Sequence, residues 1–245
     1  MTNSKVIREK IWTKLHDVAR PDTRFHMNFA EFIPDFVGSD AATDPAVADP
    51  AWQGSRFAFI TPDNCLIDLR RRMIEAGKPF VMSTYGIYRG FLFLDPAKVP
   101  EGAAEYAAWL DGMEHFGEPI TLEEIARHGR FDYLMTGASA VSMNGVRFGK
   151  GHGFFDLEWG MFTDLGLVSE DTPVHALVHD VQLVAEQLQP SETDILVDKI
   201  FTPGGTHVVE RRAKRPRGVK WPLLDPKQIA ETPPLQELQR LQSLA

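Results

Sequence analysis

The sequence predicts an α/β protein in which a mostly parallel, Rossmann-like sheet is covered by helices. Short apolar runs alternate with helical stretches, an order typical of parallel strands joined by crossover helices. With 43% hydrophobic content, the 245 residues are enough for a sizeable core. The expected strands fall, in chain order, at residues 56–61, 80–83, 131–136, 174–178 and 195–200.

The spacing of apolar residues predicts helices before and between these strands. Residues 5–18 carry apolar side chains three and four positions apart, and Pro21 is expected to end this first helix. Residues 64–76 have a helical pattern, with Gly77 as the C-terminal stop. Residues 29–52 are rich in Asp, Ala and Pro and predict an irregular stretch with one short helix.

The chain is expected to form one domain over residues 1–222, followed by a tail at 223–245. No internal repeat is found, and the only linker-like, Pro-rich text follows residue 203. The single cysteine, Cys65, cannot form an internal disulfide and is expected to be a packing residue. No signal-peptide core or membrane-length apolar run is seen. These features favour a cytoplasmic protein that does not associate with membranes.

The acidic balance of the chain argues against nucleic acid as a partner. A net charge of −8 and a pI near 5.5 do not suit a polyanion binder, which neutralises phosphates with clustered Lys and Arg. The exception is a basic run at residues 211–220. It could bind an anion or be a solvated tail, and we favour the solvated interpretation.

The most informative segment is glycine-rich and follows a predicted strand. Between residues 145 and 156, glycines recur at 145, 149, 151 and 153, so the backbone can adopt positive φ and bring its N–H groups close to an anion. Arg147 and Lys150 add positive charge, and a helix predicted over residues 154–165 offers its N-terminal dipole. Asp156 could hold a Mg²⁺ that bridges phosphates. The segment therefore predicts a phosphate cradle.

A plainer alternative stays open for this segment. It could be a glycine-rich hairpin turn, with Asp156 only a helix-start residue. It has neither the GxxxxGK[ST] spacing of a Walker loop nor the GxGxxG spacing of a dinucleotide fingerprint. No Ser/His/Asp triad can be argued either, because GASAV around Ser139 lacks the nucleophile-elbow spacing.

The segment resembles the GxRxGxGxGYYD signature of 5-formyltetrahydrofolate cyclo-ligases, also called methenyltetrahydrofolate synthetases. The resemblance extends over most of the chain and includes IPDFVGSDAA (33–42), LRRRMIEAGKPFVM (69–82), DYLMTGASAV (132–141) and TDILVDKIFTP (193–203). It implies a Rossmann-like fold with ATP on the glycine loop and a folate in an adjoining cleft. In that chemistry the ATP γ-phosphate activates a formyl oxygen, and a second nitrogen closes the ring as phosphate departs.

The candidate site residues come from the glycine-rich segment, from the position of His179 after a strand, and from the resemblance, which alone implies Lys5 and Arg8. For ATP they are Lys5, Arg8, Arg147, Gly149, Lys150, Gly151, His152, Gly153, Phe154 and Phe155. Tyr85 and Arg89 are the candidates for substrate binding. Lys150, Asp156, Glu158 and His179 are the candidates for catalysis, with Asp156 as the Mg²⁺ ligand. The alternatives are solvated charges for Lys5 and Arg8, and a helix-dipole contact for Glu158.

His175 and His179 follow a predicted strand, where the carboxyl ends of parallel strands usually build a site. His179 could act as an acid or base or hold a phosphate, because its unperturbed pKa lies near neutrality. A structural or surface role is the alternative for both histidines, and we favour it for His175.

The chain departs from the cyclo-ligase pattern inside the signature itself. The usual tyrosine pair is replaced by Phe154 and Phe155, and the position that often holds arginine is Leu157. Residues 83–96 also differ, which leaves Arg89 as the nearest cation. These departures indicate a divergent branch of the family.

Three functions therefore stay open. The first is an ATP- and Mg²⁺-dependent cyclo-ligase acting on 5-formyltetrahydrofolate or a related N-formyl compound. The second is a paralogous enzyme that uses the same cleft on another substrate. The third is a non-catalytic nucleotide or folate binder. Each takes a small molecule as its partner, and the sequence does not predict an oligomeric state.

Overall fold

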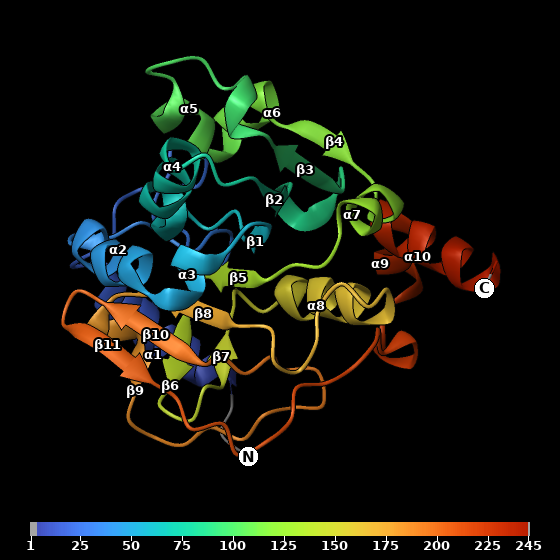
Figure 1. Ribbon diagram of the computed structural model, residues 1–245. Helices are drawn as coiled ribbons and strands as arrows, with labels where there is room; N and C mark the ends of the chain where they lie inside the picture. The colour runs from blue at the N-terminus through green and yellow to red at the C-terminus, as the bar shows by residue number, and fades with distance from the viewer. Residues whose placement is uncertain (1–3, 245) are drawn as a thin grey trace.

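An eight-stranded sheet runs through the molecule, with helices on both faces (Figure 1). The structure is a computed structural model and describes residues 4–244. The strand order is β11-β10-β8-β5-β1-β2-β3-β4. The five strands from β10 to β2 are parallel to one another, and antiparallel strands complete both edges. The predicted α/β fold with a mostly parallel sheet is confirmed.

Every predicted strand has a counterpart in this sheet. Its strands are β1 (Ala58–Ile60), β2 (Phe80–Ser83), β3 (Phe91–Leu94), β4 (Glu118–Ile120), β5 (Tyr133–Thr136), β8 (Val174–Leu177), β10 (Lys199–Thr202) and β11 (Gly205–Val208). A second sheet has the order β7-β6-β9, formed by β6 (Ala140–Ser142), β7 (Arg147–Phe148) and β9 (Leu183–Val184). The last predicted strand, at residues 195–200, begins later than expected. The Val197 N–H instead donates to the Gly145 carbonyl, so this segment closes the turn after β6.

The helices were predicted in outline but not in number. They are α1 (Ser4–Leu15), α2 (Ser39–Ala48), α3 (Pro50–Gly54), α4 (Ile67–Glu75), α5 (Ala104–Ala108), α6 (Leu110–Phe116), α7 (Leu122–His128), α8 (Phe154–Asp164), α9 (Pro226–Glu231) and α10 (Pro233–Leu244). The first helix ends at Leu15, before the predicted stop at Pro21. Residues 29–52 contain all of α2 and the start of α3, where one short helix was expected. Asp49 begins α3 by accepting a hydrogen bond from the Ala51 N–H, with Pro50 in the first turn.

Alternation along β1 divides the core into two layers. Phe59 lies on the face covered by α8, where its ring is 4.9 Å from that of Phe162. Ala58 and Ile60 face the opposite side and pack in the cluster that includes Leu69 of α4. Successive strand residues point to opposite faces, so one short strand contributes to both layers. The face carrying α8 is the one on which the glycine-rich segment lies.

The C-terminal segment is packed against the molecule. Leu235 and Leu238 of α10 are fully buried in the core beneath α7 and α8. The Glu237 carboxylate accepts hydrogen bonds from the N–H groups of Leu122 and Glu123 and so caps α7. The boundary at residue 222 stays a prediction, and residues 1–3 and 245 of the predicted domain and tail lie outside the described residues. Within residues 4–244, no helix is long and apolar enough to cross a bilayer.

The basic run at residues 211–220 was expected to be solvated, and for its central arginine this is wrong. Arg215 is 3% exposed, forms an ion pair with Asp198 and donates hydrogen bonds to the carbonyls of Leu196 and Thr172. Arg211 pairs with Asp198 and Glu170. Two arginines of the run therefore attach it to the rest of the protein, because they form ion pairs with acidic residues distant in sequence.

Candidate functional site

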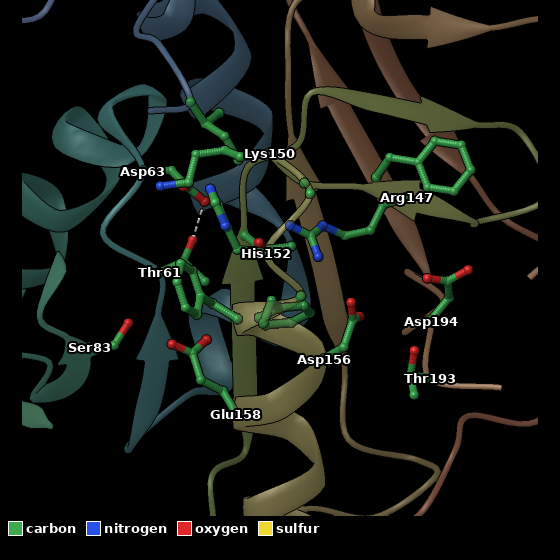
Figure 2. A pocket seen from close by; sticks show the side chains of 18 of the residues that line it. Thr61, Asp63, Ser83, Arg147, Lys150, His152, Asp156, Glu158, Thr193 and Asp194 are labelled. Carbon is green, nitrogen blue, oxygen red and sulfur yellow. Dashed lines mark hydrogen bonds between the residues drawn. The ribbon is translucent and has the colours of Figure 1, made fainter. Parts of the chain in front are cut away.

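A pocket of about 690 Å³ opens at the carboxyl ends of the parallel strands. The segments after β1, β2 and β5 form one wall, and the glycine loop with the start of α8 forms the other. This is where open α/β sheets usually bind ligands. Its polar lining includes Thr61, Asp63, Ser83, Tyr85, Arg147, Lys150, Asp156, Glu158, Thr193 and Asp194. Figure 2 shows the labelled side chains of this pocket.

The glycine loop brings a helix N-terminus to the pocket. It follows β7 and passes directly into α8, whose N-cap is Gly153 at φ +69°, with no side-chain cap. Gly151 has a φ of +117°, and a Cβ added there would lie 3.4 Å from the guanidinium of Arg8. The first turn of α8 therefore presents uncapped backbone N–H groups, and α1 is held against the loop. Such an end is suited to an anion.

Two cations lie beside it, of which Arg147 is buried and Lys150 is half-buried. The Arg147 side chain is largely buried, donates from Nε to the Gly137 carbonyl at 3.1 Å and lies 4.8 Å over the Phe155 ring. The Lys150 ammonium donates to the Glu31 carbonyl at 2.7 Å and lies 4.8 Å over the Tyr85 ring. Burial lowers the pKa of Lys150. Both positive charges are thus partly desolvated, which strengthens their interaction with an anionic ligand.

Asp156 lies at the start of α8, near Arg147 and Asp194 (Figure 2). Its Oδ1 accepts a hydrogen bond from the Ile195 N–H at 3.1 Å. Burial raises the pKa of Asp156 to about 6, with Asp194 raising it further and Arg147 opposing the change. A cation between Asp156 and Asp194 would relieve this destabilisation of the charged form.

Glu158 lies two residues after Asp156 on α8 and borders the same pocket (Figure 2). The residue is 2% exposed, and burial raises the pKa of its carboxyl to about 8. The Ser83 hydroxyl and the Arg147 charge lower this pKa, whereas Asp63 and Asp156 raise it. Glu158 is therefore mostly the neutral acid at neutral pH.

Sequence reasoning missed the polar residues that follow β1. Asp63 Oδ2 accepts hydrogen bonds from Thr61 Oγ1 at 2.5 Å and from the Gly137 N–H at 2.8 Å. These bonds connect the ends of β1 and β5 under the pocket. Their position in the sequence could have indicated them, because Thr61 and Asp63 come directly after a buried strand. Ser83, at the end of β2, was missed although it has the same signal.

Three candidates from the sequence do not line this pocket. The Nδ1 atom of His179 accepts a hydrogen bond from the Val181 N–H at 3.2 Å, so this histidine caps a short 3₁₀ turn. Arg89 is 65% exposed in its side chain and pairs with Glu114. The side chain of Lys5 is 76% exposed and lies 4.0 Å from Glu9. His175 packs away from the pocket, against the rings of Tyr133 and Phe201.

The donor set of the pocket fits a magnesium ion carried by a phosphate. Among residues 4–244, no cluster of three acidic, His or Cys side chains is arranged to hold a metal by itself. Magnesium commonly takes only one or two carboxylates and completes its shell with water and substrate phosphates. Asp156, with Asp194 nearby, meets this requirement beside the uncapped end of α8.

Comparison with known proteins finds a family whose match to this chain includes the glycine loop. Residues 1–203 match the 5-formyltetrahydrofolate cyclo-ligase family. The chain belongs to this family. The match includes the whole glycine loop and all of α8, so the resemblance noted in the sequence is confirmed. Residues after 203 form β11, the basic run at residues 211–220 and the last two helices.

Relatives in this family are distant. A methenyltetrahydrofolate synthase domain-containing protein of Homo sapiens is 30% identical over 238 residues, covering 95% of this chain and 60% of the relative. The Bos taurus protein of the same name is 28% identical over 244 residues, covering 98% of this chain and 62% of the relative. The chain thus spans less than two thirds of these relatives. The NMR structure of Aquifex aeolicus 5,10-methenyltetrahydrofolate synthetase covers 85% of this chain and 94% of its own, at 15% identity and a TM-score of 0.51, and shares its fold.

The two phenylalanines that distinguish this chain from the cyclo-ligase signature have clear positions. Phe154 stacks on His152 with ring centroids 5.3 Å apart, and its ring lies 5.8 Å from the Lys150 ammonium. Phe155 is buried beneath Arg147. Both rings support cations of the loop by cation–π contact, which requires an aromatic face and no hydroxyl.

Proposed function

We propose that this chain is an ATP- and Mg²⁺-dependent enzyme of cyclo-ligase type that acts on an N-formyl folate or a related N-formyl compound. The observation that carries the proposal is the division of one pocket into two ends. The glycine loop supplies cations and the start of α8 at one end. Ser83 and Glu158 supply polar groups for an organic substrate at the other, and the Tyr85 ring lies 4.8 Å from the Lys150 ammonium.

The phosphate end contains what phosphoryl transfer requires from a protein. This chemistry depends on positioning and on neutralising charge rather than on a protein nucleophile. Arg147 and Lys150 would neutralise the phosphate oxygens, and the backbone N–H groups at the start of α8 would orient them. Arg8, which borders the pocket from α1, would add a third cation. Asp156 would hold Mg²⁺, which supplies further charge neutralisation when bound.

The reaction that fits these groups proceeds in two steps. The formyl oxygen attacks the γ-phosphorus of ATP, so an O–P bond forms and ADP leaves. The second folate nitrogen then attacks the formyl carbon and loses its proton. The C–O bond breaks with its electron pair on oxygen, which releases inorganic phosphate and closes the ring. Phosphorylation is useful because the oxygen of an amide is otherwise a poor leaving group.

A different N-formyl or amide substrate is the second candidate. The substrate end of the pocket contains Glu158, and the loop contains Phe154 and Phe155 in place of the usual tyrosines. These changes favour an enzyme that keeps the phosphoryl transfer from ATP but recognises a different N-formyl or amide substrate. A non-catalytic binder would use the same phosphate contacts, and turnover separates it from both enzymes.

The direct test of the proposal is an absorbance assay with 5-formyltetrahydrofolate and Mg-ATP. We expect a methenyl product and one ADP for each ring closed. Asp156→Asn and Lys150→Ala should lower turnover at least tenfold, since each removes a charge at the phosphates. Arg89→Ala is the matched control because this arginine lies outside the pocket. ATP-dependent turnover that is equal in all four proteins would overturn the assigned site, and no turnover with any N-formyl substrate would overturn the proposed function.

A further inference from the structure

A second cavity, of about 210 Å³, adjoins the main pocket beside the glycine loop. Four residues border both spaces, namely His152, Gly153, Asp156 and Thr193. The two spaces therefore meet at the start of α8, where the phosphates are expected. In Figure 2, Asp156 lies between Glu158 and Thr193. The second cavity thus continues the phosphate end of the site, away from the end that Glu158 borders.

The outer wall of the second cavity comes from residues 216–228, which lie beyond the family match. Hydrogen bonds attach this wall to α8. The Trp159 indole N–H donates to the Pro216 carbonyl at 2.9 Å, and the Val219 N–H donates to the Asp164 carboxylate at 3.0 Å. The shape of the cavity is therefore set by packing of the C-terminal segment on the same helix that begins at the glycine loop.

The lining combines apolar surface with two polar side chains. Trp159, Leu223 and Leu224 supply apolar groups, whereas Lys220 supplies an ammonium and Gln228 an amide. Within residues 4–244, the side chains of Lys220 and Gln228 form neither an ion pair nor a hydrogen bond. Pockets for whole ligands usually exceed about 300 Å³, so this cavity suits one part of a ligand. A flat ring with apolar faces and a polar edge matches its lining.

We propose that the second cavity binds the base of the nucleotide whose phosphates lie on the glycine loop, with Leu223 and Gln228 in contact with that base. The inference rests on the proposed function for the position of the phosphates. The γ-phosphate must point toward the formyl substrate, so the nucleoside extends the opposite way, where this cavity lies. Lys220 adds positive charge along that path. The edge of a nucleobase carries donors and acceptors, and the Gln228 amide offers one of each kind.

The organic substrate is a less suitable occupant of the second cavity. The residues that the two spaces share belong to the phosphate end, including His152 and Gly153 of the loop. A group that extended from the substrate end into the second cavity would have to pass through the position of the phosphates. A nucleoside reaches the cavity without this conflict, because it is attached to the phosphates themselves.

The test compares Mg-ATP with Mg-tripolyphosphate, which has the phosphate chain without the nucleoside, by calorimetric titration of the full chain. Leu223→Ala and Gln228→Ala should each weaken Mg-ATP binding about three- to tenfold, because each removes a contact with the base. Binding of Mg-tripolyphosphate should not change. Leu223 is 56% exposed and Gln228 is half-buried, so both variants should fold, and circular dichroism checks this. Lys227→Ala, beside Gln228 on α9 but outside the lining, is the control and should alter neither affinity.

Amide hydrogen exchange gives a second measurement that needs no variant. Mg-ATP should slow exchange in residues 216–228, whereas Mg-tripolyphosphate should not. Unchanged Mg-ATP affinity in both variants, or equal weakening of both ligands, would overturn the inference and leave the phosphate site in place. If the wild-type protein bound neither ligand, the proposed function would fail, and the inference would fail with it.

Discussion

Two carboxyl groups on α8 differ in their ionisation because they differ in surroundings. Asp156 has a raised pKa of about 6, yet it accepts a backbone hydrogen bond and lies near Arg147. Glu158 is deeper, and its pKa reaches about 8. Asp156 is therefore mostly charged at neutral pH and suited to a cation, whereas Glu158 is mostly neutral and suited to a hydrogen bond. Two residues apart, the same functional group thus has two different pKa values.

The stability of the free protein should report the state of Glu158. The folded-state pKa is raised from 4.5 to about 8, so the stabilising contribution of the proton is fully present below pH 4.5 and is lost as the pH rises through 8. Wild type should therefore lose stability relative to Glu158→Gln, by up to about 1 kcal/mol per pH unit between pH 5 and 8. Urea unfolding at several pH values measures this difference. Parallel stability curves for the two proteins would show that the carboxyl is not destabilised by burial.

The basic segment at residues 211–220 shows how composition can mislead. Arg215 is inserted between β10 and the loop before β8, with its guanidinium bonded to Asp198 and to backbone carbonyls. It also lies 5.2 Å over the ring of Trp159 in α8. The segment that follows passes close to α8, since a Cβ added at Gly160 would lie 3.1 Å from the Gly218 carbonyl oxygen. Residues outside the family match are thus attached to the helix that begins at the glycine loop.

Replacing the buried arginine should cost far more than replacing an exposed neighbour. Arg215→Ala leaves the Asp198 carboxylate without this partner and removes three carbonyl contacts, so we expect a loss of about 3–5 kcal/mol in the free energy of unfolding. Arg217→Ala, at an exposed position of the same run, should change it by no more than about 0.5 kcal/mol. Chemical denaturation measures both. Similar small losses in the two variants would restore the solvated interpretation of the run.

The C-terminal helices complete the core of the molecule on the side of α7 and α8. Leu235 and Leu238 are fully buried, and Glu237 caps α7 between them. Segments more than a hundred residues apart thus share one hydrophobic cluster. The start of α8 lines the pocket, and the last helices pack in the same hydrophobic cluster as α8. They therefore support the pocket although they do not line it.

Deleting a buried methyl-rich side chain from α10 should test this support. Leu238→Ala should lower the free energy of unfolding by about 2–5 kcal/mol, the usual cost of a cavity in a packed core. Leu244→Ala, at a position that is 79% exposed, should have little effect. Thermal or urea unfolding of the full chain gives both values. If Leu238→Ala were as stable as wild type, α10 would not be part of the cooperative core.

The strands and the glycine loop could be predicted from the sequence because their signals are local. Apolar runs mark β1, β2, β5 and β8, and glycine spacing marks the loop. Asp63 and Ser83 could not be placed by such signals, because their roles depend on strands that meet only in the folded sheet. Arg215 was misjudged for the same reason, since the acids that neutralise it lie elsewhere in the chain. His179 carried a catalytic expectation from its position after a strand, but local geometry makes it a cap.

In the proposed reaction a formyl oxygen receives the phosphoryl group at the glycine loop. The most direct measurement follows that oxygen in a reaction with Mg-ATP and 5-formyltetrahydrofolate labelled with ¹⁸O in the formyl group. Mass spectrometry of the released phosphate should find one ¹⁸O for each methenyl product, because the C–O bond breaks after the O–P bond has formed. Unlabelled phosphate, or ATP hydrolysis without ring closure, would contradict phosphoryl transfer to the formyl oxygen.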